Sequence, residues 1–192
     1  MTESTPAGAL LAAGTSQRFG ERNKLLAEIE GTPVVRRAAT TLVEASLDGV
    51  VAVVGHEAAA VEGALDGLDI ERLRNPEYAE GQATSVREAA RWARRRDAPA
   101  LVVALGDMPW VQPETIDELL AGWRRDHDIV VPTYDGMRGN PVLFDRTHFD
   151  SLAAVSGDSG GRQLFAGNPV HRIPVPDAGI RRDVDRPGDL ES

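Results

Sequence analysis

The sequence predicts an α/β fold in which a mostly parallel sheet is covered by helices on both faces. Strand and helix patterns alternate through about the first two-thirds of the chain. Residues 50–54 and 101–105 are continuous apolar runs, which are typical of strands buried on both faces. No repeat or linker divides the 192 residues, and this length fits one domain. We therefore expect a three-layer α/β/α, Rossmann-like domain over residues 1–192.

The N-terminal half supplies the first expected strands and helices. Residues 7–13 are small and apolar between Pro6 and Gly14, which indicates a short buried strand entering a turn. Pro33 suits the first turn of a helix, and apolar residues then recur at helical spacing until near Ser46. The remaining expected elements of this half are strand 50–54, helix 57–65, strand 70–73, and a helix that Thr84 or Ser85 would cap.

The C-terminal half continues the alternation with shorter elements. Strand 101–105 ends at Gly106 and Asp107, and Pro113 opens a helix that ends near Gly122. The further expected elements are strands 129–131 and 142–144, helices 149–155 and 160–165, and strand 171–175. Because ligands bind outside the carboxyl ends of strands in such sheets, the loops 14–24, 75–85 and 106–109 are candidates for function.

Composition excludes several classes of protein. The chain has no cysteine, which excludes disulfides, thiolate metal sites and cysteine nucleophiles. The net charge of −9 disfavours nucleic acid as a partner. Its apolar stretches are far shorter than a membrane span, and the polar N-terminus lacks the basic start of a signal peptide. We therefore expect a cytoplasmic protein with no membrane association.

The loop after the first expected strand combines glycines with positive charge. Gly14 and Gly20 allow backbone N–H groups to face anionic oxygens, and Arg18 and Lys24 lie in or beside the same loop. Lys24 is the only lysine among 21 basic residues. The loop suits a triphosphate, although its spacing matches neither a P-loop nor the dinucleotide-binding fingerprint. An ordinary glycine-bearing surface loop is the alternative.

Carboxylates mark a second candidate site. Asp107 directly follows strand 101–105, where a hard oxygen ligand could hold Mg²⁺ carried by phosphates. Asp183 and Asp185 could complete the site if the tail folds back across the sheet edge. A turn residue and a solvated acidic tail are the alternatives. Two further polar segments, which contain Asn140 and Asp158, could line a second-substrate pocket or simply form turns.

These motifs together resemble the MobA-like nucleotidyltransferases. Residues 11–26 resemble their signature loop, L-A-[AG]-G-x-S-x-R-[MF]-G followed shortly by a lysine. Residues 106–109 resemble their G-D-x-P metal motif, and residues 81–87 their G-x-x-x-S-[LVI] segment. Residues 139–144 and 157–162 are similar to later family segments, and residues 183–190 resemble the closing D-[IV]-D-x-P-x-D-L. The matches follow the family order over nearly the whole chain and imply a nucleotidyltransferase fold.

Within this family, the sequence most resembles the molybdenum cofactor cytidylyltransferases. Ala13 gives the A-A-G form of the loop where guanylyltransferases usually have A-G-G, and its methyl group would narrow the base pocket. The resemblance implies transfer of CMP from CTP to a phosphorylated acceptor such as molybdopterin cofactor, with release of pyrophosphate and with a molybdoenzyme system as a partner. Gln82, Ala83 and Thr84 depart from the cytidylyltransferase pattern, so the sequence does not determine the identity of the acceptor.

The resemblance also implies roles for individual residues. Arg18 and Lys24 would be catalytic and would hold the triphosphate. Asp107 and Asp185 would bind Mg²⁺, and Asn140 and Asp158 would face the acceptor. The expected nucleotide-binding residues are Leu11, Ala12, Ala13, Gly14, Ser16, Lys24, Asn75 and Ser85.

Three alternatives are considered beside this interpretation. The first is a guanylyl or sugar-phosphate nucleotidyltransferase of the same fold. The second is a non-catalytic nucleotide-binding sensor, which would not need Arg18, Lys24 and Asp107 together. The third, a nicotinamide-dependent oxidoreductase, is disfavoured because the dinucleotide fingerprint fails and the second strand ends in Gly55 and His56 rather than an acid.

Overall fold

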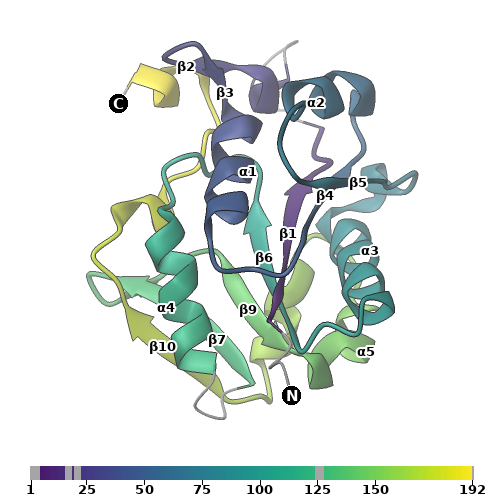
Figure 1. The fold of residues 1–192 in the computed structure, drawn as a ribbon, viewed down its shortest axis with the longest axis vertical. Helices are drawn as coiled ribbons and strands as arrows, with labels where there is room; N and C mark the ends of the chain where they lie inside the picture. Colours follow the sequence, from purple (N-terminus) through teal and green to yellow (C-terminus); the bar gives the residue numbers. More distant parts are fainter. Residues whose placement is uncertain (1–4, 16–18, 20–22, 124–127, 192) are drawn as a thin grey trace.

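The computed structural model describes residues 5–15, 19, 23–123 and 128–191. In this part of the chain, one eight-stranded sheet forms the centre, with the strand order β10-β7-β9-β6-β1-β4-β5 and with β8 paired to β7 (Figure 1). The strands are β1 (Ala7–Ala12), β4 (Val50–Val54), β5 (Glu71–Arg74), β6 (Ala100–Leu105), β7 (Ile129–Tyr134), β8 (Met137–Arg138), β9 (Val142–Asp145) and β10 (Val170–Pro174).

Most neighbouring strands run parallel, as the sequence predicts. The pairs β1–β4, β1–β6, β4–β5 and β7–β10 are parallel, whereas β9 runs antiparallel to both β6 and β7. Parallel neighbours bring the carboxyl ends of β1, β4 and β6 to one edge of the sheet. The loops that follow these strands therefore meet there.

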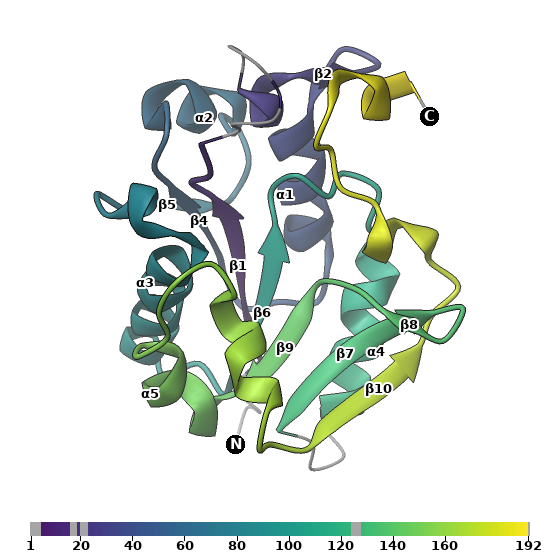
Figure 2. The same cartoon turned by 180° about the vertical axis from the view of Figure 1, so that it is seen from behind.

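Helices cover both faces of the sheet, which confirms the three-layer prediction (Figures 1 and 2). Along β1, Ala9 and Leu11 belong to the core on the side of α3 and α5, whereas Leu10 and Ala12 belong to the core on the side of α1, α2 and α4. This alternation explains the continuous apolar run, because both faces of the strand are buried. The helices are α1 (Val34–Glu44), α2 (Ala58–Ala64), α3 (Gln82–Arg95), α4 (Pro113–Trp123) and α5 (Phe149–Leu152).

Some local predictions were wrong. Helix α3 begins at Gln82 after Gly81, whose φ of 115° suits glycine, so neither Thr84 nor Ser85 caps it. Helix α5 ends at Leu152 rather than near residue 155. The helix predicted over residues 160–165 is present with these bounds, as a 3₁₀ helix. The sequence also did not indicate the short β2–β3 pair (Glu28–Ile29 and Thr32–Pro33) or β8. Among the described residues, no helix is long and apolar enough to cross a membrane.

The C-terminal tail returns to the carboxyl edge of the sheet. The Asp177 carboxylate accepts hydrogen bonds from the backbone N–H of Gln112 and the Thr115 hydroxyl, at 2.9 and 2.7 Å. Farther along, the Val184 N–H donates to the Asp107 carbonyl at 2.8 Å, and the Val184 side chain is fully buried. These contacts explain the course of the tail in Figure 2, from β10 up to the end of β6.

Candidate active site

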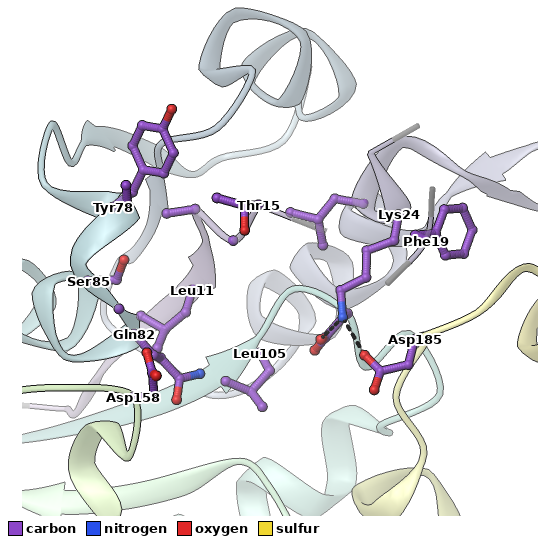
Figure 3. Close-up of a pocket in the computed structure, with 16 residues that line it drawn as sticks. Leu11, Thr15, Phe19, Lys24, Tyr78, Gln82, Ser85, Leu105, Asp158 and Asp185 are labelled. Atoms are coloured by element: carbon purple, nitrogen blue, oxygen red, sulfur yellow. Dashed lines mark hydrogen bonds and ion pairs between the residues drawn. The ribbon is translucent and has the colours of Figure 1, made fainter. Parts of the chain in front are cut away.

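A cavity of about 500 Å³ lies at the carboxyl ends of β1 and β6 (Figure 3). In Figure 3, Lys24 and Asp185 lie at one end, which is charged, and Tyr78 and Ser85 lie at the other. Asp107 binds Lys24 at the charged end. The lining residues are Leu11, Ala13, Gly14, Thr15, Phe19, Lys24, Leu25, Tyr78, Ala79, Gly81, Gln82, Ser85, Leu105, Asp107, Asp158 and Asp185.

Lys24 links two carboxylates at the charged end. Its Nζ donates to Asp107 Oδ2 at 2.7 Å and to Asp185 Oδ1 at 2.9 Å. Three separate segments supply these groups: Lys24 begins the short 3₁₀ helix Lys24–Leu26, Asp107 follows β6, and Asp185 lies in the returning tail. The Asn23 side chain caps the 3₁₀ helix by accepting from the Leu25 N–H, which fixes the backbone beside Lys24.

The surroundings of Lys24 keep it charged at neutral pH. Burial by itself lowers the pKa of the Lys24 ammonium, but the attraction and hydrogen bonds of Asp107 and Asp185 outweigh burial and raise the pKa above its ordinary value of 10.5. Burial also raises the pKa of the Asp183 carboxyl, and the negative charges of Asp107 and Asp185 add to this effect. The charged end therefore holds more negative charge than one ammonium neutralises.

The carboxylates of Asp107, Asp183 and Asp185 fit a divalent cation. Each offers one oxygen, and these three oxygens lie within 4.8 Å of one another. The second oxygen of Asp107, Oδ1, is buried and has no hydrogen-bond partner among the described residues. Clustered oxygen donors of this kind suit Mg²⁺ or Mn²⁺. The structure thus places Asp183 next to the two expected ligands, Asp107 and Asp185.

The opposite end of the cavity is built from neutral hydrogen bonds. Asn75 is buried, and its Nδ2 donates to Thr84 Oγ1 at 2.8 Å and to Ser85 Oγ at 3.1 Å. Its Oδ1 accepts from the Glu77 N–H at 2.9 Å. Ser85 lines the cavity, whereas Asn75 lies behind it and orders the first turn of α3.

The remaining expected nucleotide-binding residues divide between the cavity and the layer beneath it. Leu11, Ala13 and Gly14 line the cavity, whereas Ala12 is buried in the core below and does not. Ser16 lies outside the described residues, as does the expected catalytic residue Arg18.

Sequence reasoning missed Tyr78, which forms part of the cavity wall (Figure 3). A Cβ atom at Gly55 would lie 2.5 Å from Tyr78 Cβ and 2.9 Å from Ala13 Cβ, so these three residues pack closely. The signal in the sequence was Gly55 at the end of a β-branched strand, because such a glycine often marks a close approach.

The two expected acceptor residues, Asp158 and Asn140, lie in or next to the cavity. Asp158 lines the main cavity beside Gln82. Asn140 lies in an adjoining smaller pocket that shares Leu11, Gln82 and Leu105 with the main one. Asp158 therefore lines the main cavity itself, whereas Asn140 lines only the pocket next to it.

Comparisons with known proteins agree with this architecture. The family model described as MobA-like NTP transferase domain matches residues 8–173. Nicotine blue oxidoreductase from Paenarthrobacter nicotinovorans is 29% identical over 188 residues, which cover 93% of this chain and 91% of that protein. The bifunctional IPC transferase and DIPP synthase of Rubrobacter xylanophilus is 38% identical over 177 residues, and the match covers 90% of this chain but only 37% of that longer protein.

A solved structure matches the whole fold. Rv0371c from Mycobacterium tuberculosis H37Rv has a TM-score of 0.81 and 32% sequence identity, and the match covers 98% of this chain and 100% of that one. The same protein has also been solved in a complex with manganese, where it is 30% identical to this chain with a TM-score of 0.80.

Proposed function

This chain belongs to the MobA-like NTP transferase domain family, and on that premise we propose that it transfers CMP from CTP to a phosphorylated acceptor such as molybdopterin cofactor, with Mg²⁺ and with release of pyrophosphate. The observation that carries the proposal is the arrangement of the cavity. A single space connects Lys24, Asp107 and Asp185, with the Asp183 carboxylate close to the two aspartates, to an end lined by Tyr78 and Ser85 that suits a base and ribose.

The chemistry of nucleotidyl transfer fits the charged end. In-line attack at the α-phosphorus needs positioning and charge neutralisation more than a strong base. A Mg²⁺ ion held by Asp107, Asp183 and Asp185 would neutralise phosphate oxygens. Lys24 would then exchange these carboxylates for phosphate oxygens, with Arg18 as a second positive group. Because Lys24 stays protonated, its ammonium can stabilise charge on the leaving pyrophosphate.

The neutral end supports CTP as the donor. Ala13 lines the cavity, and its methyl group lies against the Gly55–Tyr78 contact. A glycine at position 13 would leave more space beside Tyr78, which would suit a larger purine. Ser85, held by Asn75, would offer a fixed hydroxyl to the nucleoside.

The name of one full-length relative supplies a second candidate, an oxidoreductase. The carboxylate cluster favours the transferase, since hydride transfer has no need of three acidic groups around a lysine. Oxidation of NADH or NADPH in the presence of nicotine blue would support the second candidate. Its absence, together with pyrophosphate release from an NTP, would exclude it.

A panel of four NTPs tests the proposal. With Mg²⁺ present, CTP should raise the thermal unfolding temperature more than ATP, GTP or UTP, because a bound ligand stabilises the folded state. Pyrophosphate release should then require CTP, Mg²⁺ and a phosphorylated acceptor together. Preference for GTP, or release only with a sugar phosphate, would indicate another transferase of this family. Binding of CTP without release by any acceptor would indicate a nucleotide sensor.

A further inference from the structure

A polar groove adjoins the main cavity on the side of Asp158. It has a volume of about 460 Å³ and is lined by Gln82, Arg138, Asp158, Ser159, Arg162 and Gln163. Gln82 and Asp158 line the main cavity as well, so the two spaces are neighbours across these two side chains. Every lining side chain is polar, which suits a charged or hydroxylated ligand and disfavours an apolar one.

Two arginines from different elements line this groove. Arg138 belongs to β8 and Arg162 to the 3₁₀ helix Gly160–Phe165. The Arg138 guanidinium lies 4.9 Å from the centre of the Phe165 ring, and this stacking restricts its orientation. The two arginines lie 24 positions apart in the sequence, and the fold brings both to one groove.

These arginines differ from about half of the described arginines, which pair with a carboxylate. Many described guanidinium groups pair with a carboxylate, as Arg74 does with Glu62 and Arg96 with Glu71. Within the described ranges, neither Arg138 nor Arg162 forms an ion pair, although Asp158 lines the same groove. Their planar donor sets therefore remain available for an oxyanion, which guanidinium groups bind with two parallel hydrogen bonds.

Helix α3 packs closely against the loop before residue 160, and this contact fixes the positions of the residues that line both the groove and the cavity. The Ala83 N–H donates to the Gly157 carbonyl at 3.1 Å. A Cβ atom at Gly81 would lie 2.5 Å from Asp158 Oδ1, and one at Gly160 would lie 3.0 Å from Gln82 Oε1. The pocket that contains Asn140 shares Leu105 with the cavity and Arg162 with the groove, so it connects the two.

We propose that Arg138 and Arg162 bind a second anionic group of the acceptor, at the end remote from the attacking phosphate. This inference rests on the proposed function, because it assumes that the attacking phosphate lies at the Lys24 end of the cavity. The acceptor would then carry, besides the attacking phosphate, a second and remote oxyanion group. Asp158, between the two spaces, would accept hydrogen bonds from hydroxyl groups in the middle of the acceptor.

Titration with inorganic phosphate tests this site directly. The wild-type protein is first saturated with Mg²⁺ and the NTP that stabilises it most, which occupies the triphosphate site, and phosphate binding is then measured by calorimetry. The wild type should bind phosphate under these conditions. Arg138→Gln and Arg162→Gln should each weaken this binding by about tenfold, because each removes a charged hydrogen-bond donor. Acetate in place of phosphate tests whether a carboxylate is accepted.

Arg95→Gln serves as the matched control, because Arg95 is exposed on the last turn of α3, at the end opposite Gln82. It should bind phosphate as the wild type does. With an active acceptor, Arg162→Gln should raise KM for that acceptor and leave KM for the NTP and kcat near wild type. If Arg138→Gln lowers the stability of the protein because the Phe165 contact is lost, the phosphate affinity of Arg162→Gln relative to the wild type decides the test.

Two results would overturn the inference. One is wild-type protein that binds no phosphate once the NTP site is filled, and the other is equal phosphate binding by the wild type and the Arg138→Gln/Arg162→Gln double variant. Failure of the proposed function is a different result: either no NTP binds, or an NTP binds but no acceptor causes pyrophosphate release. In that case the difference in phosphate binding between the wild type and the double variant, measured without nucleotide, still reports on the groove.

Discussion

The two ends of the cavity hold their polar groups in contrasting ways. At the neutral end, Asn75 binds Thr84 and Ser85, residues 9 and 10 positions away, and all three side chains are buried. At the charged end, Lys24 bridges Asp107 and Asp185, residues 83 and 161 positions away, and these side chains are 15%, 21% and 37% exposed.

This difference teaches which part of the site is preformed. Buried neutral hydrogen bonds are costly to break, so the neutral end should keep its geometry with or without a ligand. Partly exposed ion pairs are weaker and can be exchanged. The charged end should therefore change partners when substrate binds, while the neutral end supplies a fixed reference for the nucleoside.

The largest expected effect comes from removing the ammonium at the charged end. Lys24→Ala should lower the rate of pyrophosphate release by about 10²–10³-fold, as is typical for the loss of one pre-organised charge stabiliser. The fold should persist, because Lys24 is partly exposed and its backbone is held by Asn23. Steady-state kinetics and circular dichroism check these two expectations, and turnover at the wild-type rate would remove Lys24 from its assigned role.

At the neutral end, Asn75→Ala should lower the free energy of unfolding by about 1–3 kcal/mol, because buried hydroxyl partners lose their donor. It should also raise KM for the nucleotide, since Ser85 would no longer be held. Denaturant unfolding and kinetics measure both. Asn168→Ala is the control, because Asn168 donates to the Leu164 carbonyl away from the cavity. The KM of this variant for the nucleotide should equal that of the wild type. An unchanged KM in Asn75→Ala would contradict the fixed-reference interpretation.

The contrast between the ends also predicts how metal binds without nucleotide. Lys24→Met keeps the length of the side chain but removes the ammonium that bridges Asp107 and Asp185. The variant should therefore bind Mn²⁺ about tenfold more tightly than the wild type, because the cation no longer competes with Lys24 for these carboxylates. Electron paramagnetic resonance of free Mn²⁺ measures this affinity. Equal or weaker binding by the variant would mean that Lys24 and the metal do not share ligands.

A smaller effect is expected from the methyl group beside Tyr78. Ala13→Gly should shift the preference between CTP and GTP toward GTP by about tenfold or less, as one methyl group in a pocket typically contributes. The ratio of kcat/KM for the two nucleotides measures the change. A ratio that stays at the wild-type value would show that position 13 does not set the base preference.

The central architecture could be predicted because it depends on local pattern. Runs such as Val50–Val54 are apolar throughout, and burial on both faces of a sheet is the usual cause of such a run. The placement of Lys24 and Asp107 in the cavity could also be predicted, because the loops that contain them follow β1 and β6 and meet at the carboxyl edge of the sheet.

Features that depend on distant contacts could not be predicted. The ion pair between Lys24 and Asp185 joins residues 161 positions apart, and the tail reaches this place only through bonds such as that from the Val184 N–H to the Asp107 carbonyl. The predicted cap at Thr84 or Ser85 was wrong because the helix begins earlier, at Gln82 after Gly81, and both hydroxyls instead accept from Asn75, which lies beyond a turn. Nothing in the local sequence around Arg138 indicates that it lines the same groove as Arg162.

A Mg²⁺ titration of pyrophosphate release tests the central claim most directly, namely that the carboxylates at the charged end support nucleotidyl transfer. Wild-type protein and Asp107→Asn are compared with CTP and an active phosphorylated acceptor. The wild type should show a saturable dependence on Mg²⁺, and Asp107→Asn should show a lower rate with a weaker dependence. Superimposable titrations of the two proteins would contradict it.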